Sequence, residues 1–288
     1  MHDLIFFEEK LRKIVDLMIA APCPPRLAQA IEYAVFGGGN RLRPRLLLAV
    51  ARTCKKTDDS LCLYGAAAIE LIHSASLVHD DLPAFDNAEM RRNAPSVHAK
   101  YGQAIGVLVG DALLVGGFTA LSLASKEFPQ KAGELIRMLT QATGCPSGII
   151  AGQAWEEEES VAVEEYHRSK TASLFEWAAM AGALCAGEDP ESYRGLGRYV
   201  GMAYQIADDL RDELGDPSDL GKPSGKDKEL NRPSIVKEMG VDSAMQLFES
   251  TLEKAIHSVP ACKSHEELTS FVDELLARFR TALSGKAG

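Results

Sequence analysis

The chain has 288 residues, of which 46% are hydrophobic and 25% are charged, and its formal net charge is −10. This composition is typical of a globular protein and excludes a disordered or fibrous one. An acidic protein repels the phosphates of duplex DNA, which argues against a general nucleic-acid binder. Anionic small molecules stay in consideration, because they respond to local clusters of Lys and Arg rather than to the net charge.

Targeting and redox signals are few. The six cysteines are scattered without a Cys-x-x-Cys pair, which predicts reduced thiols in a cytoplasmic protein. The N-terminal segment carries acidic residues early and has no basic region followed by an apolar core, so we expect no signal peptide. The longest apolar run, around 104–123, is interrupted by Asp111. We interpret that run as a buried helix rather than a membrane span.

Helical periodicity dominates the chain, in long stretches separated by short breaks. Three prolines, at 22, 24 and 25, end the first expected helix, glycines 37–39 end the second, and Pro83 stops the fourth. The expected helices cover 3–20, a segment ending at 36, a segment starting near Pro44, and 59–81, 103–125, 131–151, 160–187, 190–212, 234–257 and 264–284.

Almost no stretch alternates apolar and polar residues over the length of a strand, so we expect almost no sheet. The segment 213–233 is rich in Gly, Pro, Asp and Lys and is expected to be a loop. No linker or low-complexity segment divides the chain. The sequence therefore predicts a single all-α domain over residues 1–288.

Two clusters of aspartates carry the strongest chemical signal. They are Asp80, Asp81 and Asp86 at the end of one apolar helix, and Asp208, Asp209 and Asp212 within another. Pro83 requires a loop that brings Asp86 back towards Asp80, whereas Asp208 and Asp212 share one helix face. Clustered carboxylates repel one another unless a cation neutralises them. Hard oxygen ligands favour Mg²⁺, although an isolated aspartate pair would usually be an exposed helix end.

Basic residues accompany both clusters. Arg91 and Arg92 follow the first, Lys222, Lys226 and Arg232 follow the second, and Arg41, Arg43 and Arg45 surround Pro44. Each group alone would be a solvated surface, but together they favour a diphosphate substrate. His73 lies seven residues before Asp80, nearly on the same helix face, and is a further candidate donor. The acidic run Glu156–Glu159 is interpreted as the surface of a helix end, without a function.

The sequence resembles the trans-isoprenyl diphosphate synthases (polyprenyl synthetases) over roughly residues 30–240. The matching blocks are GGGNRLRPRL, ELIHSASLVHDDLPAFDNAEMRRNAPSVHAKYG, GDALL, AGQAW, KTASLF, YQIADDLRDELGD and LGKPSGKD. Within the family it is most similar to bacterial geranylgeranyl diphosphate synthases. The resemblance implies a helical bundle around a deep central cavity, usually dimeric, with the two aspartate motifs facing each other. The implied activity is a Mg²⁺-dependent prenyltransferase that condenses isopentenyl diphosphate head to tail with allylic diphosphates.

The resemblance also implies roles for individual residues. Mg²⁺ would be bound by Asp80, Asp86 and Asp208, with Asp81, Asp209 and Asp212 supporting them. The allylic diphosphate would be held by Arg91, Lys170, Thr171, Gln205 and Lys222, and isopentenyl diphosphate by Arg43, His73 and Arg92. Lys170, Thr171 and Gln205 would also guide the allylic cation.

Three positions depart from the family pattern. Asn40 stands where the family often has Lys, Arg232 where it usually has a Lys that contacts the allylic diphosphate, and Glu156 where its Gly-Gln-x-x-Asp block has Asp. The first change weakens one contact to isopentenyl diphosphate or moves it to another residue. None of the three removes an expected metal ligand.

Product length should depend on the helix before Asp80. Ala75, five residues earlier, is small, and an aromatic residue there is the family's common way of stopping at fifteen carbons. Ser76 is small too, whereas Leu71 and Ile72, one turn deeper, are bulky enough to form a floor. We therefore expect a twenty-carbon product, geranylgeranyl diphosphate.

Other activities remain in competition. A farnesyl diphosphate synthase would share every motif and differ in product length. A class I terpene cyclase would not need a second basic site, and a head-to-head synthase would take two allylic substrates. A catalytically silent partner subunit of another prenyl synthase should have lost metal ligands, yet all six aspartates are present.

Overall fold

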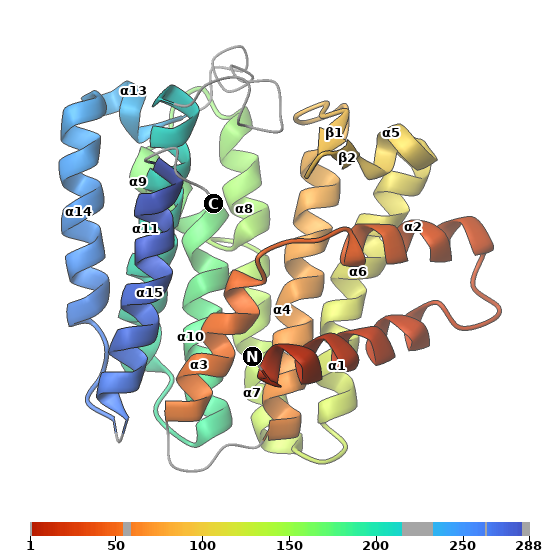
Figure 1. The fold of residues 1–288 in the computed structure, drawn as a ribbon. Helices are drawn as coiled ribbons and strands as arrows, with labels where there is room; N and C mark the ends of the chain where they lie inside the picture. Colours follow the sequence, from red (N-terminus) through yellow and green to blue (C-terminus); the bar gives the residue numbers. More distant parts are fainter. Residues whose placement is uncertain (1, 54–58, 215–232, 263, 284–288) are drawn as a thin grey trace. The chain divides into compact units, whose positions relative to one another are not determined.

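The computed structural model of the protein describes residues 2–53, 59–214, 233–262 and 264–283. The chain divides into two compact units (Figure 1). Unit 1 comprises Met1–Leu48 and Asp58–Ile136, and unit 2 comprises Ala49–Thr57 and Arg137–Gly288. Helices α3 (Leu42–Thr53) and α7 (Pro129–Thr143) contribute residues to both. The single domain expected over residues 1–288 stays a prediction.

Unit 1 is built around a pair of long apolar helices, α4 and α6, which lie side by side (Figure 1). Its other elements are three helices and a short antiparallel hairpin in which Arg91 pairs with Ala94. The elements are α1 (His2–Met18), α2 (Pro25–Phe36), α4 (Asp59–Asp80), β1 (Met90–Arg91), β2 (Ala94–Pro95), α5 (Val97–Tyr101) and α6 (Gln103–Ala124).

Helices α4 and α6 approach closely because α6 presents glycines to α4. A Cβ atom on Gly117 would lie 2.7 Å from Ile72 Cγ1, and one on Gly110 would overlap the His79 ring. By length and composition, both helices could cross a membrane. The buried share is 72% for the Ser60–Asp80 window but 44% for the Gln103–Ala124 window, so the helix expected to be buried around 104–123 is only partly buried.

Unit 2 is also helical, and α11 is its central element, in contact with α10, α14 and α15 (Figure 1). The elements are α8 (Ile149–Ala154), the 3₁₀ turn η1 (Trp155–Glu157), α9 (Val163–His167), the π-helical turn η2 (Arg168–Ala172), α10 (Ser173–Ala186), α11 (Glu191–Leu214), α13 (Ile235–Met239), α14 (Val241–His257) and α15 (His265–Leu283). The predicted all-α fold is confirmed, and among the described residues the two-residue strands β1 and β2 are the only sheet.

Three expected helices are interrupted in the structure. The helix expected over 131–151 ends at Thr143, and α8 begins only at Ile149, after a turn that contains Pro146. The helix expected over 234–257 breaks at Gly240, whose φ of +81° lies in the left-handed region. The helix expected over 160–187 widens at η2 into a π turn, which sequence periodicity does not reveal.

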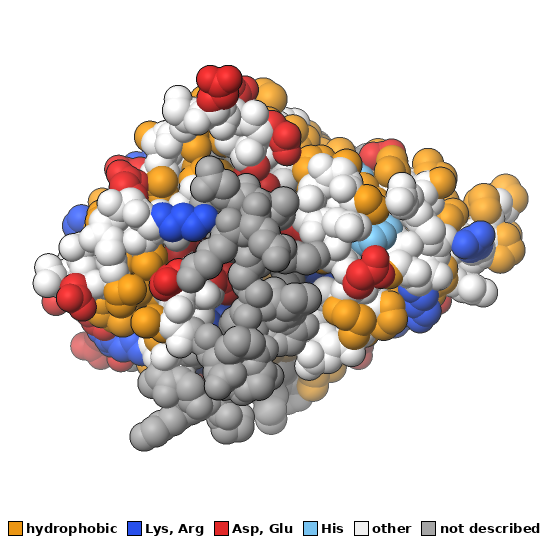
Figure 2. Space-filling view, turned by 90° about the horizontal axis from the view of Figure 1, so that it is seen from above, with side chains coloured by type: hydrophobic (Ala, Val, Ile, Leu, Met, Phe, Trp, Pro, Cys, Tyr) orange, Lys and Arg blue, Asp and Glu red, His pale blue; other side chains and the backbone are white. Residues whose placement is uncertain are grey.

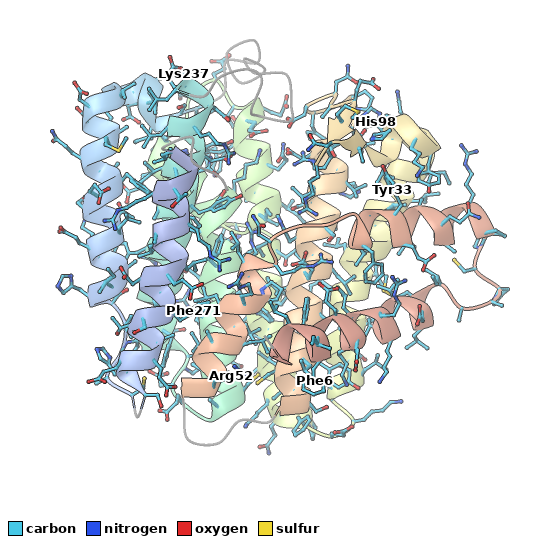
Figure 3. The ribbon with its side chains drawn as sticks, in the orientation of Figure 1. Phe6, Tyr33, Arg52, His98, Lys237 and Phe271 are labelled. Carbon is cyan, nitrogen blue, oxygen red and sulfur yellow. The ribbon has the colours of Figure 1, made fainter. Side chains whose placement is uncertain are left out.

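The surface of the described residues mixes charged and apolar side chains. Acidic, basic and apolar groups are interspersed on the face seen in Figure 2. In unit 1, large apolar side chains are exposed on α1 and α6, including Phe6, which is labelled in Figure 3. On α6 these are Val107, Leu108 and Val115, of which Val115 is 63% exposed. These three residues are referred to below as the α6 apolar face.

The contact between α10 and α11 requires glycine at one position. A Cβ atom on Gly197 would lie 2.4 Å from the carbonyl oxygen of Phe175 and 2.5 Å from Glu176 Cα, both backbone atoms that cannot move alone. At Gly195, on the same helix, the nearest atom would be Ser258 Cβ at 3.6 Å, an ordinary contact. The two positions therefore differ in packing but not in helical environment.

We expect Gly197→Ala to lower the free energy of unfolding by about 1–3 kcal/mol, because overpacking outweighs the better helix propensity of alanine. The control Gly195→Ala should leave stability unchanged or raise it by up to about 1 kcal/mol. Urea unfolding followed by circular dichroism measures both. Equal stability of the two variants would contradict the packing explanation.

Candidate active site

The first aspartate motif lies where α4 ends. Asp80 is the last residue of the helix, and the chain then turns back on itself. The backbone N–H of Asp86 donates to the carbonyl oxygen of Asp80 at 2.9 Å, and that of Ala88 donates to Asp81 at 3.0 Å. The loop thus returns Asp86 to Asp80, as Pro83 led us to expect.

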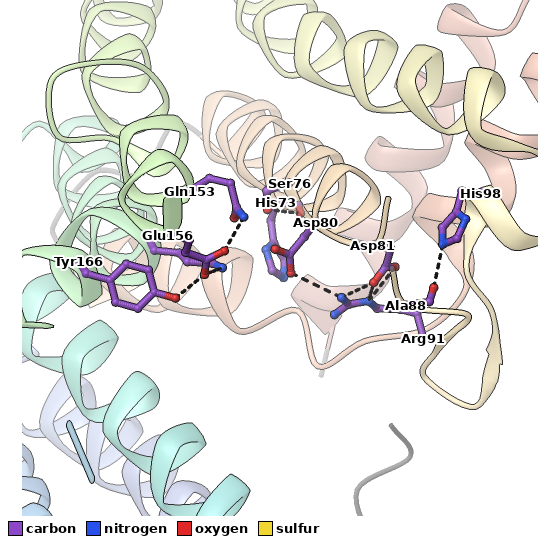
Figure 4. A network of polar contacts seen from close by, with 11 residues as sticks. His73, Ser76, Asp80, Asp81, Ala88, Arg91, His98, Gln153, Glu156 and Tyr166 are labelled. Atoms are coloured by element: carbon purple, nitrogen blue, oxygen red, sulfur yellow. Dashed lines mark hydrogen bonds and ion pairs between the residues drawn. The ribbon is translucent and has the colours of Figure 1, made fainter. Parts of the chain in front are cut away.

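Arg91 binds the middle aspartate of this motif. Its Nε lies 2.9 Å from both carboxylate oxygens of Asp81, and its Nη2 lies 3.7 Å from Asp80 Oδ2 (Figure 4). Asp81 is buried, so the bidentate arginine compensates its charge where water cannot. In this structure, Arg91 therefore supports the aspartates directly, in addition to the diphosphate contact expected from the sequence.

Two further side chains fix the segment that carries Arg91. Nε2 of the His98 ring donates to the carbonyl oxygen of Ala88 at 3.0 Å (Figure 4), and the Tyr33 hydroxyl donates to that of Pro95 at 2.7 Å. His98 and Tyr33 are both labelled in Figure 3, on α5 and α2. The guanidinium of Arg91 is therefore positioned from both sides of the hairpin.

A cationic group occupies the same unit. Arg43 is buried, and Arg92 donates to the carbonyl oxygen of Gly38. Burial lowers the pKa of His73 well below its ordinary value, and the positive charges of Arg43, Arg92 and Arg91 lower it further. His73 is therefore neutral at physiological pH, and its buried Nδ1 has no hydrogen-bond partner among the described residues. The expected isopentenyl diphosphate ligands Arg43, His73 and Arg92 are thus electrostatically coupled.

Arg41 is held by carboxylates of the same unit, although its positive charge also contributes to lowering the pKa of His73. Its Nη1 lies 2.6 Å from Glu70 Oε1, its Nε 2.9 Å from Glu8 Oε1, and its Nη2 donates to the Val35 carbonyl. The side chain is buried and its charge is compensated by two carboxylates. Arg41 ties α1 and α4 to the turn before α3, which is a structural role.

The second aspartate motif lies on α11 in unit 2. Asp209 Oδ1 accepts from Gln205 Nε2 at 2.9 Å, and Oδ2 accepts from the Ile235 N–H at 2.8 Å and lies 3.3 Å from His167 Nε2. Burial alone would raise the pKa of Asp209, but these neighbours outweigh it and hold that pKa below its ordinary value. Asp208, next to it, forms an ion pair with Arg211.

Gln205 also connects this motif to η2. The Thr171 hydroxyl donates to Gln205 Oε1 at 2.6 Å. Thr171, Gln205 and Asp209 therefore form one continuous chain of hydrogen bonds between η2 and α11. Two residues that the sequence assigned to the allylic diphosphate thus share a single network with the second aspartate motif.

Lys170 is held by a carboxylate that the sequence analysis dismissed. Its ammonium forms an ion pair with Glu156, whose side chain is only 5% exposed. Tyr166 and Gln153 bind the same carboxylate, at 2.5 Å and 2.7 Å (Figure 4). The interpretation of 156–159 as a solvated helix end is therefore wrong for Glu156. Its position in the AGQAWE block was the available signal.

Two expected ligands, Lys222 and Arg232, and the basic residue Lys226 lie outside the described residues. Of the remaining aspartates, Asp212 lies one turn after Asp208 on α11. His167, which is 1% exposed, is a further residue that the sequence analysis did not single out.

The carboxylates suit a metal that the substrate helps to hold. Within the described part of the chain, no group of three or more His, Cys, Asp or Glu side chains could hold an ion alone. Mg²⁺ commonly takes one or two protein carboxylates and completes its shell with substrate phosphates and water. Asp80 and Asp86, joined by the loop, supply hard oxygen donors of that kind.

Comparison with known proteins agrees with this chemistry. Residues 24–274 match the model of the polyprenyl synthetase family. The geranylgeranyl diphosphate synthase of Cereibacter sphaeroides is 44% identical over 270 residues, covering 92% of this chain and 94% of that protein. The farnesyl diphosphate synthase of Geobacillus stearothermophilus is 34% identical over 265 residues, covering 88% and 89%.

Solved structures give the same result. A polyprenyl synthase from Caulobacter crescentus, complexed with calcium and isoprenyl diphosphate, matches with a TM-score of 0.81 and 25% identity over 98% of this chain and 95% of that chain. A geranyltransferase from Helicobacter pylori, complexed with magnesium and isoprenyl diphosphate, matches with a TM-score of 0.79 and 27% identity over 98% of both. The resemblance seen in the sequence is confirmed, and the chain is a prenyltransferase that belongs to the polyprenyl synthetase family.

Proposed function

We propose that the protein adds isopentenyl diphosphate head to tail to allylic diphosphates, in a Mg²⁺-dependent reaction that ends at geranylgeranyl diphosphate. The observation that carries this proposal is the composition of unit 1. One helix, α4, ends at Asp80, directly before Asp81, and also bears His73, which is coupled to Arg43 and Arg92. A metal-dependent and a purely cationic diphosphate site fit a condensation of two diphosphates. A terpene cyclase would need only the first.

The ionisation step falls to the aspartates and their partners. Asp80, Asp86 and Asp208 would hold Mg²⁺, which would stabilise the negative charge on the departing diphosphate. Asp81 and Asp209 would instead hold the motifs in place, because Arg91 and the donors around Asp209 already occupy their oxygens. Asp212 shares a helix face with Asp208 and would support it.

The allylic group would be handled by residues of η2 and α11. Lys170 would contribute positive charge to the allylic diphosphate, with Glu156 limiting where its ammonium can lie. The Thr171 hydroxyl donates a hydrogen bond to Gln205. The lone pairs of the hydroxyl oxygen would therefore point towards an allylic cation. Such fixed dipoles stabilise a developing charge without reorganisation.

The twenty-carbon product rests on α4 and on the relatives. Ala75 is small and buried, and the Ser76 hydroxyl turns back to donate to the His73 carbonyl at 2.8 Å. Neither side chain is large enough to stop a growing chain near Asp80. Leu71 and Ile72 are completely or almost completely buried, and Ile72 packs on Gly117 of α6, which would make this level of the helix difficult to displace.

We expect the purified protein, with Mg²⁺ and labelled isopentenyl diphosphate, to convert dimethylallyl, geranyl and farnesyl diphosphate to a twenty-carbon product. Chromatography after phosphatase treatment measures the chain length. Chelation of the metal should abolish turnover, as should Asp80→Asn. A fifteen-carbon end product would replace the proposed product with farnesyl diphosphate, and no product from any primer would support the silent-subunit alternative.

The same assay tests the role of Ala75. Ala75→Phe should shift the main product towards fifteen carbons, because the ring would block the path along α4. Ser76→Ala, which removes an oxygen and adds no bulk, should leave the product unchanged. An unchanged product from Ala75→Phe would remove the structural basis for the predicted length.

We also propose that the protein is a homodimer that pairs through the α6 apolar face. Val107, Leu108 and Val115 lie on one long helix and are exposed, although large exposed apolar side chains in a row are unfavourable in water. A second copy of the same face would cover them around a two-fold axis.

Val115→Lys is therefore expected to convert the dimer to a monomer, because each subunit would bring a charge to the centre of the contact. Light scattering after size-exclusion chromatography measures the mass. Met239→Lys, at an exposed apolar position of α13, serves as the control and should leave the dimer intact. A wild-type monomer, or a Val115→Lys dimer, would refute this interface.

A further inference from the structure

Four polar side chains of the segment 166–171 form two pairs with different partners. Tyr166 and Lys170, four residues apart, both bind Glu156. His167 and Thr171, also four apart, reach Asp209 and Gln205 of α11. The established family chemistry accounts for Lys170 and Thr171. It does not account for Tyr166.

The Glu156 carboxylate is shared unequally among three donors. Oε1 accepts both the Tyr166 hydroxyl, at 2.5 Å, and the Lys170 ammonium, whereas Oε2 accepts Gln153 Nε2 at 2.7 Å. Tyr166 is 4% exposed, so its hydroxyl has no exchange with bulk water to compensate for a lost partner. Charge-assisted hydrogen bonds of this kind are stronger than neutral ones.

Backbone packing keeps the group together. A Cβ atom on Gly152 would lie 2.3 Å from the backbone nitrogen of Lys170, so only glycine lets α8 approach η2 this closely. That approach brings Gln153, on α8, and Glu156, in η1, to the lysine. The Glu156 carboxylate therefore holds the Lys170 ammonium on this side.

We propose that Tyr166 is a positioning residue that sets the Lys170 ammonium through Glu156, and so tunes the affinity for the allylic diphosphate. This inference rests on the proposed function, in which Lys170 contacts that substrate. Because Tyr166 donates to the same oxygen as Lys170, it withdraws negative charge from the lysine's partner. Without the hydroxyl, Oε1 attracts Lys170 alone and holds the ammonium back from the substrate.

The side-chain length of Glu156 fits this arrangement. The family block has the shorter aspartate at this position, and the extra methylene in Glu156 extends the reach of the carboxylate. In this chain the carboxylate meets a tyrosine from α9, a lysine from η2 and a glutamine from α8. Tyr166 and Glu156 thus act as a matched pair.

Tyr166→Phe removes only the hydroxyl and tests the proposal. We expect the KM for the allylic diphosphate to rise roughly three- to tenfold, the equivalent of one hydrogen bond to a charged group. The KM for isopentenyl diphosphate should stay within about twofold, because that substrate does not meet Lys170. Tyr193→Phe, at an equally buried tyrosine near the start of α11, is the matched control and should change neither constant.

A double-mutant cycle distinguishes positioning from loss of structure. In a Glu156→Gln background, Tyr166→Phe should change the allylic KM by less than about twofold, because the carboxylate through which it acts is gone. Equal losses in both backgrounds, parallel increases in both KM values, or an unchanged allylic KM would each overturn the proposal. Absence of turnover in the wild type would instead refute the proposed function, and this inference with it.

Discussion

Repulsion between clustered carboxylates is the constraint on which both units depend. Each aspartate motif contains two adjacent aspartates. In each motif, protein groups compensate the negative charge of the second of the two, Asp81 or Asp209. In unit 1, Arg91 donates hydrogen bonds to both carboxylate oxygens of Asp81. In unit 2, His167, Gln205 and the Ile235 N–H contact Asp209 and hold its pKa below the ordinary value although it is buried. The neighbouring aspartates also have protein cations beside them, Arg91 at 3.7 Å from Asp80 and Arg211 in an ion pair with Asp208.

The same reasoning applies with the opposite sign to the cationic group. Burial, together with the positive charges of Arg43, Arg92 and Arg91, lowers the pKa of the neighbouring His73 and keeps its ring neutral. A neutral imidazole adds no repulsion, yet one ring nitrogen still carries a proton to donate. A bound diphosphate would reduce the repulsion between the arginines and would also accept a hydrogen bond from the ring N–H of His73. The site is thus unfavourable to cations and poised for an anion, although the protein as a whole is acidic.

Much of this could be predicted from the sequence, and the failures have physical causes. Helices α4 and α6 were predicted to within a residue, because apolar runs of that length have few alternatives. The return of Asp86 followed from Pro83. Glu156 was missed because four consecutive acids usually form a solvated face, and its partners Tyr166 and Lys170 are ten and fourteen positions away. The structural role of Arg41 could not be predicted, because only the fold brings Glu8 and Glu70 to it. The roles of individual site residues stay predictions.

The η2 turn explains why the two partner sets of unit 2 act together. A Cβ atom on Gly152 would touch the backbone of Lys170, and one on Gly201 would lie 2.6 Å from Ala172 Cα. The turn is therefore clamped between α8 and α11 by two positions that accept only glycine. A π turn closes i→i+5 hydrogen bonds and widens the helix locally, and such turns are frequent at functional sites. Here it lets Lys170 reach Glu156 while Thr171, its neighbour, reaches Gln205. Because both side chains leave the same clamped backbone, neither can be repositioned without disturbing the other.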